Sequence, residues 1–140
     1  MASAKATIDL PIPPDKVWNL IGGFGSLPEW LPFIRKSDLT RGGRLRHLQD
    51  PEGHPIVEQL ERYDNAARTY SYSIVESPFP VVNYLATITV SLAEVGRGAH
   101  VEWAGTFTSN GASDAEVHTL FQGIFSDGLK ALSEHYEAAR

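Results

Sequence analysis

Apolar and polar residues alternate with a period of two through the middle of the chain, between residues 34 and 108. This period is typical of β-strands that bury one face. Short gaps with turn residues such as Gly53 and Gly96 divide the stretch into six segments. We therefore predict strands at residues 34–40, 43–48, 56–63, 69–76, 84–94 and 99–108, joined as an antiparallel meander.

The chain before this region predicts one more strand and two short helices. Residues 5–10 alternate weakly and should form the first strand. Pro13 and Pro14 then begin a helix, because proline is tolerated in a first turn. Ser26 is followed three residues later by Glu29, which is the spacing of a capping box and indicates a second helix that ends near Leu31.

One long helix is predicted over residues 113–138. Ser113 and Glu116 have the capping-box spacing, and a broad apolar face follows them. Gly123 and Gly128 interrupt the helix, where each glycine costs roughly 0.5–1 kcal/mol relative to alanine. Gly128 lies four residues after Ile124, on the buried stripe, so we expect it to face a cavity or a closely packed strand.

These elements predict an α+β fold of the helix-grip type. A curved seven-stranded antiparallel sheet, with two short helices, would wrap around the C-terminal helix and enclose an internal cavity. We expect the rim of its opening to be formed by residues 77–80 and 22–27, with Phe79 and Phe24 exposed. The hairpin turns near Asp50 and Gly96 should lie away from it.

Length and composition set limits on the function. A chain of 140 residues suggests one domain over residues 1–140, and 42% hydrophobic with 21% charged residues is typical of a globular protein. A formal net charge of -5 gives no basic surface for nucleic acid. No segment has the pattern of a membrane span or signal peptide, so we expect a cytoplasmic monomer or homodimer with no membrane insertion.

Common cofactor and metal motifs are not found in the sequence. There is no cysteine, and the five histidines do not have metal-ligand spacing. The glycines around Phe24 match neither nucleotide-binding pattern, and no serine has the context of a hydrolase nucleophile. We therefore expect no metal and no cofactor.

Several segments resemble the START/Bet v 1-like (SRPBCC) superfamily, in particular its polyketide cyclase/dehydrase and lipid-transport branch. The matching pieces are Pro14 with Val17 and Trp18, the segment from Phe24 to Trp30, residues 57–60, and Gly128 with Leu132. The resemblance covers nearly the whole chain. It implies the helix-grip fold and a small hydrophobic ligand, since members bind or transform lipids, polyketides and plant hormones.

A narrower resemblance is to the plant lachrymatory-factor synthase-like proteins. It rests on residues 30–32, 45–46, 58–60, 72–77, 84–87 and 101–103, which follow in the same order at similar spacing. The plant enzyme uses an Arg and a Glu on neighbouring strands, and matching the motifs places them on Arg46 and Glu58. The segment 38–43 is shorter here, so the resemblance does not identify the substrate.

Strand parity supports part of this assignment. Glu58 shares a face with Ile56 and Leu60, so burial would raise the pKa of its carboxyl unless a cation such as Arg46 restores the charged form. Arg46 shares its own face with Arg44 and Leu48, and parity does not decide whether it points inward. Both charges could also face solvent on a half-exposed sheet.

Aromatic and apolar residues gather on the faces expected to be concave. We assign ligand contacts to Trp30, Phe33, Tyr70, Tyr72, Phe79, Ile88, Trp103, Phe121 and Phe125. A plain hydrophobic core would have the same pattern. Buried tyrosine hydroxyls and an indole N–H need partners, however, and several around one space suit a ligand with a polar tip.

Three functions are compatible with these observations. The first is a cofactor-free cyclase, dehydratase or isomerase, with Glu58 as proton shuttle, Arg46 keeping it ionised or stabilising negative charge, and Tyr84 orienting the substrate. The second is a non-catalytic carrier of a lipid or other hydrophobic ligand, with Arg46 and Glu58 as anchors. The third is a regulatory interaction domain, which should have a filled core.

Overall fold

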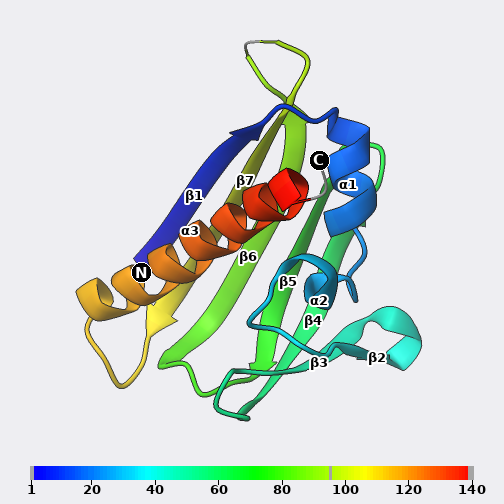
Figure 1. Cartoon of the computed structure of the whole chain (residues 1–140). Coiled ribbons are helices and arrows are strands. Elements are labelled where there is room, and N and C mark those ends of the chain that lie inside the picture. Colours follow the sequence, from blue (N-terminus) through cyan, green and yellow to red (C-terminus); the bar gives the residue numbers. More distant parts are fainter. Residues whose placement is uncertain (1, 95, 139–140) are drawn as a thin grey trace.

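The computed structural model describes residues 2–94 and 96–138. Its centre is an antiparallel sheet of seven strands in the order β1-β7-β6-β5-β4-β3-β2 (Figure 1). The strands are β1 (Ala2–Leu10), β2 (Asp38–Thr40), β3 (Leu45–Gln49), β4 (Pro55–Asp64), β5 (Thr69–Glu76), β6 (Val81–Leu92) and β7 (Ala99–Ser109). The meander from β2 to β7 is confirmed, and β1 joins it by pairing with β7.

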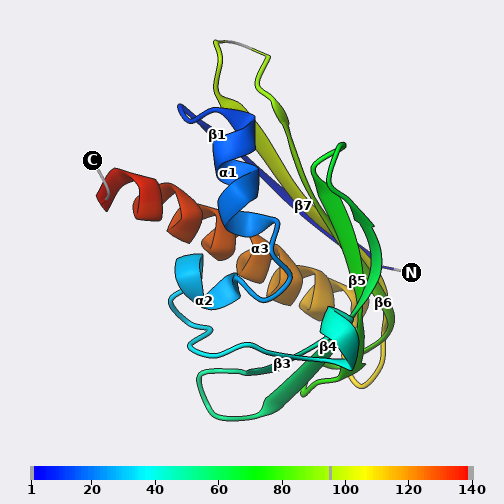
Figure 2. The ribbon, with the colours of Figure 1, turned by 90° about the vertical axis from the view of Figure 1, so that its right-hand side faces the viewer.

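Three α-helices accompany the sheet. They are α1 (Pro14–Ile21), α2 (Leu27–Trp30) and α3 (Asp114–Ala138). The sheet curves around α3, while α1 and α2 lie beside it on the same concave side (Figure 2). The predicted helix-grip arrangement is confirmed. None of the helices in the described residues is long and apolar enough to span a membrane.

Helix α3 begins with the predicted capping box. The Glu116 amide donates to Ser113 Oγ, and the Ser113 amide donates to the Glu116 carboxylate, both at 3.1 Å. Further along, Gly128 allows α3 to approach β7 closely, since a Cβ there would lie 2.6 Å from Cζ3 of Trp103. Gly128 therefore packs against a strand, as predicted, and its contact sets how deep Trp103 lies under the helix.

The second predicted capping box is wrong. Ser26 precedes α2 but makes no side-chain cap, and its buried hydroxyl has no hydrogen-bond partner within the described part of the chain. Its φ of -88° and ψ of -2° already lie in the helical region, whereas a side-chain cap needs an extended residue.

The predicted strand over residues 34–40 is shorter than expected. Only Asp38–Thr40 pairs as β2, because the amide of Ile34 bonds the carbonyl of Leu31 and turns the chain inward. A single 3₁₀ turn, η1 (Arg41–Gly43), then delays the start of β3 to Leu45, with Gly42 at a positive φ of 66°. The consequence is that Ile34, together with the neighbouring Phe33, lines an internal cavity instead of beginning a strand.

Register shifts bend the sheet near the site. Strand β4 shifts relative to β5 between Val57 and Glu58 and again between Leu60 and Arg62. Bulges of this kind increase local twist and redirect side chains. Glu58 thus lies at a bulge toward β5 while remaining in regular register with β3 on its other side.

Candidate functional site

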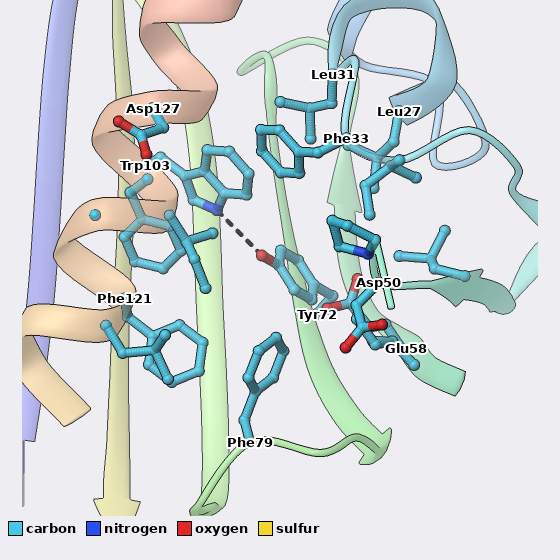
Figure 3. A pocket seen from close by; sticks show the side chains of 18 of the residues that line it. Leu27, Leu31, Phe33, Asp50, Glu58, Tyr72, Phe79, Trp103, Phe121 and Asp127 are labelled. Atoms are coloured by element: carbon cyan, nitrogen blue, oxygen red, sulfur yellow. Dashed lines mark hydrogen bonds between the residues drawn. The ribbon is translucent and has the colours of Figure 1, made fainter. Parts of the chain in front are cut away.

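A cavity of about 500 Å³ lies between α3 and the concave face of the sheet. Its wall is mostly apolar, with aromatic side chains from the sheet, α3 and the β5–β6 loop directed toward the space in Figure 3. Charged or hydroxyl-bearing side chains enter the wall at six places: Arg46, Asp50, Glu58, Tyr72, Tyr84 and Asp127.

Arg46 and Glu58 form the charged centre of this wall. They are direct partners in the antiparallel register of β3 and β4, so their side chains share one face. Arg46 Nε donates to Glu58 Oε1 at 2.8 Å, and Nη2 lies 2.8 Å from the same oxygen. With exposures of 1% and 7%, both residues are buried, which decides the face that strand parity left open.

The remaining contacts of Arg46 hold it behind Glu58. Its Nη1 donates to the carbonyl of Phe24 at 3.0 Å and to the Tyr70 hydroxyl at 3.2 Å. The guanidinium carbon also lies 4.2 Å from the centre of the Phe24 ring and 4.7 Å from that of Tyr72. These contacts enclose the cation with acceptors and aromatic faces.

Only one oxygen of the Glu58 carboxylate is occupied by Arg46. Oε2 has no hydrogen-bond partner among the described residues, yet it is not a fully buried atom. Since Glu58 lines the cavity, Oε2 is the oxygen that a molecule inside could reach. The pair therefore presents a carboxylate oxygen, rather than a guanidinium, to the space.

Burial and neighbouring groups shift the pKa of each member of the pair in opposite directions. Burial raises the pKa of Glu58, and the neighbouring Arg46 only partly offsets this effect. Burial alone would lower the pKa of Arg46, but Tyr70, Glu58 and Tyr72 together raise it. Arg46 therefore stays charged, and Glu58 is a stronger base than an exposed carboxylate.

A second polar group consists of two tyrosines and a tryptophan. Trp103 Nε1 donates to the Tyr72 hydroxyl at 3.1 Å (Figure 3), and the hydroxyls of Tyr72 and Tyr84 are 3.4 Å apart. Burial, the largest influence, raises the pKa of both tyrosines, so both remain protonated. Two hydroxyls that share one hydrogen bond leave one O–H free to donate to a ligand.

Nine of the twelve predicted site residues line the cavity. They are Arg46, Glu58 and Tyr84, together with Phe33, Tyr72, Phe79, Trp103, Phe121 and Phe125.

Trp30, Tyr70 and Ile88 do not belong to this lining, so their placement at the cavity wall needs correction. Trp30 packs its ring 5.9 Å from that of Trp103, and the Tyr70 hydroxyl is occupied by Arg46. Ile88 lies in the core, opposite Tyr70 and Trp103 in the sheet.

The rim also differs from the prediction. Phe79 and Leu27 line the cavity as expected of their segments, but Phe24 is buried against Arg46. Asp50 and Pro51, from the hairpin expected to lie away from the opening, are part of the lining. The β3–β4 and β5–β6 turns lie at the same end of the sheet in Figure 1, which explains the difference.

Sequence reasoning missed two acidic residues of the lining, Asp50 and Asp127. The helical spacing could have predicted Asp127, since it lies three residues after Ile124 and therefore next to the apolar face of α3. Asp50 is held by its own turn, where Oδ1 accepts from the amides of Glu52 and His54. Those bonds outweigh burial and lower the pKa of Asp50.

In residues 2–94 and 96–138, no cluster of three or more His, Asp or Glu side chains could hold a metal ion.

Comparison with known proteins gives the family. The family described as polyketide cyclase / dehydrase and lipid transport matches residues 1–137. The chain belongs to this family. A search of curated proteins finds no match.

Solved structures of other proteins are similar to this chain. The protein XoxI from Bacillus cereus is 51% identical, with a TM-score of 0.93 over 96% of this chain and 94% of that one. Ara h 8.0201 is 17% identical, with a TM-score of 0.76 over 97% of each chain. The di-domain ARO/CYC BexL from the BE-7585A biosynthetic pathway is 22% identical, with a TM-score of 0.78 over 98% of this chain and 47% of that one.

At their levels of identity, the last two comparisons show the fold alone. They connect this polyketide cyclase/dehydrase and lipid-transport family member to the Bet v 1-like fold. The narrower resemblance to lachrymatory-factor synthase-like proteins stays a prediction.

Proposed function

We propose that this protein binds a small, largely apolar molecule in its cavity and catalyses cofactor-free acid/base chemistry on it. The observation that carries the proposal is the Glu58 carboxylate, which is buried, bound at Oε1 by Arg46 and open to the cavity at Oε2. A cyclisation, dehydration or isomerisation needs a base in a water-poor site, and this carboxylate meets that requirement.

In the proposed reaction, Glu58 Oε2 takes a proton from a carbon next to a ligand carbonyl. The C–H electron pair forms a carbon–carbon double bond, and the carbonyl π pair moves to oxygen. A hydroxyl of the Tyr72 and Tyr84 pair donates a hydrogen bond to that oxygen. In a β,γ-unsaturated ketone, the oxygen pair then re-forms the carbonyl, the double bonds shift, and Glu58 returns the proton to the γ carbon, which completes an isomerisation. In a β-hydroxy ketone, the oxygen pair re-forms the carbonyl, the C–O bond to the β-hydroxyl breaks, and that oxygen takes the proton from Glu58 and leaves as water, which completes a dehydration.

Arg46 acts as a positioning residue in this scheme. Its Nε donates to Oε1, its Nη2 lies 2.8 Å from the same oxygen, and its charge opposes the rise that burial causes in the pKa of Glu58. Because the guanidinium is itself fixed by Phe24 and Tyr70, the base needs little reorganisation during proton transfer.

The decisive experiment replaces Glu58 by Gln and measures turnover on a panel of cyclisable, dehydratable and isomerisable ketones. We expect turnover to fall by roughly 10²-fold or more while ligand affinity changes little, because the amide keeps the shape but cannot accept the proton. Glu61→Gln is the matched control, since Glu61 is exposed on the same strand and bonds Ser73 and Gln59 outside the cavity.

Carriage of a hydrophobic ligand is the second candidate function. It is favoured by the mainly apolar wall of the cavity, which needs only a few polar anchors to hold a ligand. Native mass spectrometry of freshly purified protein would detect a retained molecule. A retained ligand, together with no turnover of the ketone panel by the wild-type protein, would support the carrier and contradict the enzyme.

A further inference from the structure

The cavity has a marked asymmetry in its charges. Arg46 is its single cation, and that guanidinium is enclosed by Glu58, Phe24 and Tyr70. The other charged residues of the lining are Glu58, Asp50 and Asp127, all acidic. Any charge that a bound molecule could approach directly in this lining is therefore negative.

Two basic residues near the opening do not alter this picture. Arg35 and Lys36 line an adjoining surface hollow, which shares Phe33, Asp50 and Pro51 with the cavity, but neither basic residue is part of the cavity wall. Their long side chains are solvated, and water screens their effect on the interior.

From this asymmetry we infer that Glu58 determines ligand specificity: the cavity selects an uncharged apolar molecule with a hydrogen-bond donor, such as a hydroxyl, and rejects carboxylates. The inference rests on the proposed function of the same site. Glu58 Oε2 is an acceptor without a partner in residues 2–94 and 96–138, so a ligand hydroxyl can donate to it. The Tyr72 and Tyr84 pair can donate to an acceptor elsewhere on the same ligand.

A carboxylate ligand would meet the opposite conditions. Its negative charge would be buried beside Oε2 with no free cation, because Glu58 already neutralises Arg46. An ammonium ligand would also be disfavoured, since the neutralised pair offers little net charge to offset its desolvation. Asp127 is exposed and Asp50 is only half-buried, so water screens their attraction for a cation deep in the cavity. The uncharged donor is the one class that loses no charge hydration and still satisfies Oε2.

The test uses three probes that share one alkyl chain: 1-decanol, decanoate and decylamine. Each is measured at neutral pH by displacement of the uncharged fluorophore N-phenyl-1-naphthylamine from the wild-type protein. We expect decanol to bind about tenfold more tightly or better than decanoate, and more tightly than decylamine, because each ion must lose its hydration without a compensating partner.

Glu58→Gln supplies an independent measurement. Removing the negative charge leaves Arg46 available, so decanoate should gain affinity and the preference for decanol should shrink by about tenfold or reverse. Glu61→Gln should keep the wild-type order of the three probes. The wild-type series alone decides the inference if the Glu58 variant fails to fold.

The outcomes separate this inference from the proposed function. Decanoate binding as tightly as decanol to the wild type would overturn the inference but leave a ligand-binding cavity. Decylamine binding most tightly would also overturn it and indicate a cation site. Failure of the fluorophore and all three probes to bind would overturn both the inference and the proposed function.

Discussion

Replacing Glu58 by Gln should destabilise the protein because it leaves Arg46 as a buried cation without its counter-charge. Arg46 is 1% exposed, so its guanidinium cannot reach water without rearrangement. Removing one member of a buried pair costs about 3–5 kcal/mol. We expect about 3 kcal/mol here, since Phe24 and Tyr70 still accept from Nη1 and the new amide oxygen can still accept from Nε.

Adding Arg46→Met should recover part of this loss. Methionine removes the orphaned cation and fills much of its volume with apolar atoms. The double variant should be about 1–3 kcal/mol more stable than Glu58→Gln alone, with a coupling energy of about 2–3 kcal/mol between the two sites. Urea unfolding of all four proteins at neutral pH, followed by circular dichroism, gives these values if the slopes agree.

An exposed ion pair provides the matched control. Arg68 Nε lies 2.8 Å from Asp15 Oδ1, the same separation as between Arg46 Nε and Glu58 Oε1, but Asp15 is largely exposed. The cycle of Asp15→Asn and Arg68→Met should give less than about 1 kcal/mol. Coupling at Arg46 and Glu58 as small as in this control would refute the argument that burial gives the pair its energy.

Two further changes test other parts of the structure. Gly128→Ala should lose about 1–3 kcal/mol of unfolding free energy, because the new Cβ would lie 2.6 Å from the Trp103 ring. Gly123→Ala should gain about 0.5–1 kcal/mol, because a Cβ at Gly123 would have nothing within 4 Å. Equal effects of the two changes in urea unfolding would contradict the close packing at Gly128. Burial already raises the pKa of Glu58 in the folded protein, and Arg46→Met removes the charge that opposes this shift. The contribution of the Glu58 proton to the unfolding free energy of Arg46→Met should therefore be fully present below the unfolded pKa of 4.5 and be lost as the pH rises through the higher folded pKa. A difference in unfolding free energy from wild type that does not change with pH would be inconsistent with a buried carboxyl.

The sequence by itself was sufficient for the fold, because element type depends on local periodicity. A period of two marked the strands β4, β5 and β7 almost to their ends, and the Ser113 capping box marked the start of α3. The same periodicity put Glu58 on the face of Ile56 and Leu60 but left open whether its charge faces solvent, and in the structure the residue is buried. It had less success at residues 34–37, where a turn bonded to Leu31 replaces the strand.

Tertiary structure decided which inward-facing groups meet one another. Tyr70 shares a strand face with Tyr72, yet Arg46 occupies its hydroxyl, and only Tyr72 lines the cavity. Phe24 looked like an exposed rim residue in a glycine-rich segment, but its ring packs on the guanidinium of Arg46 and its carbonyl oxygen accepts a hydrogen bond from Nη1. A period along one strand specifies a face, whereas the occupant of the space above that face comes from segments distant in the sequence.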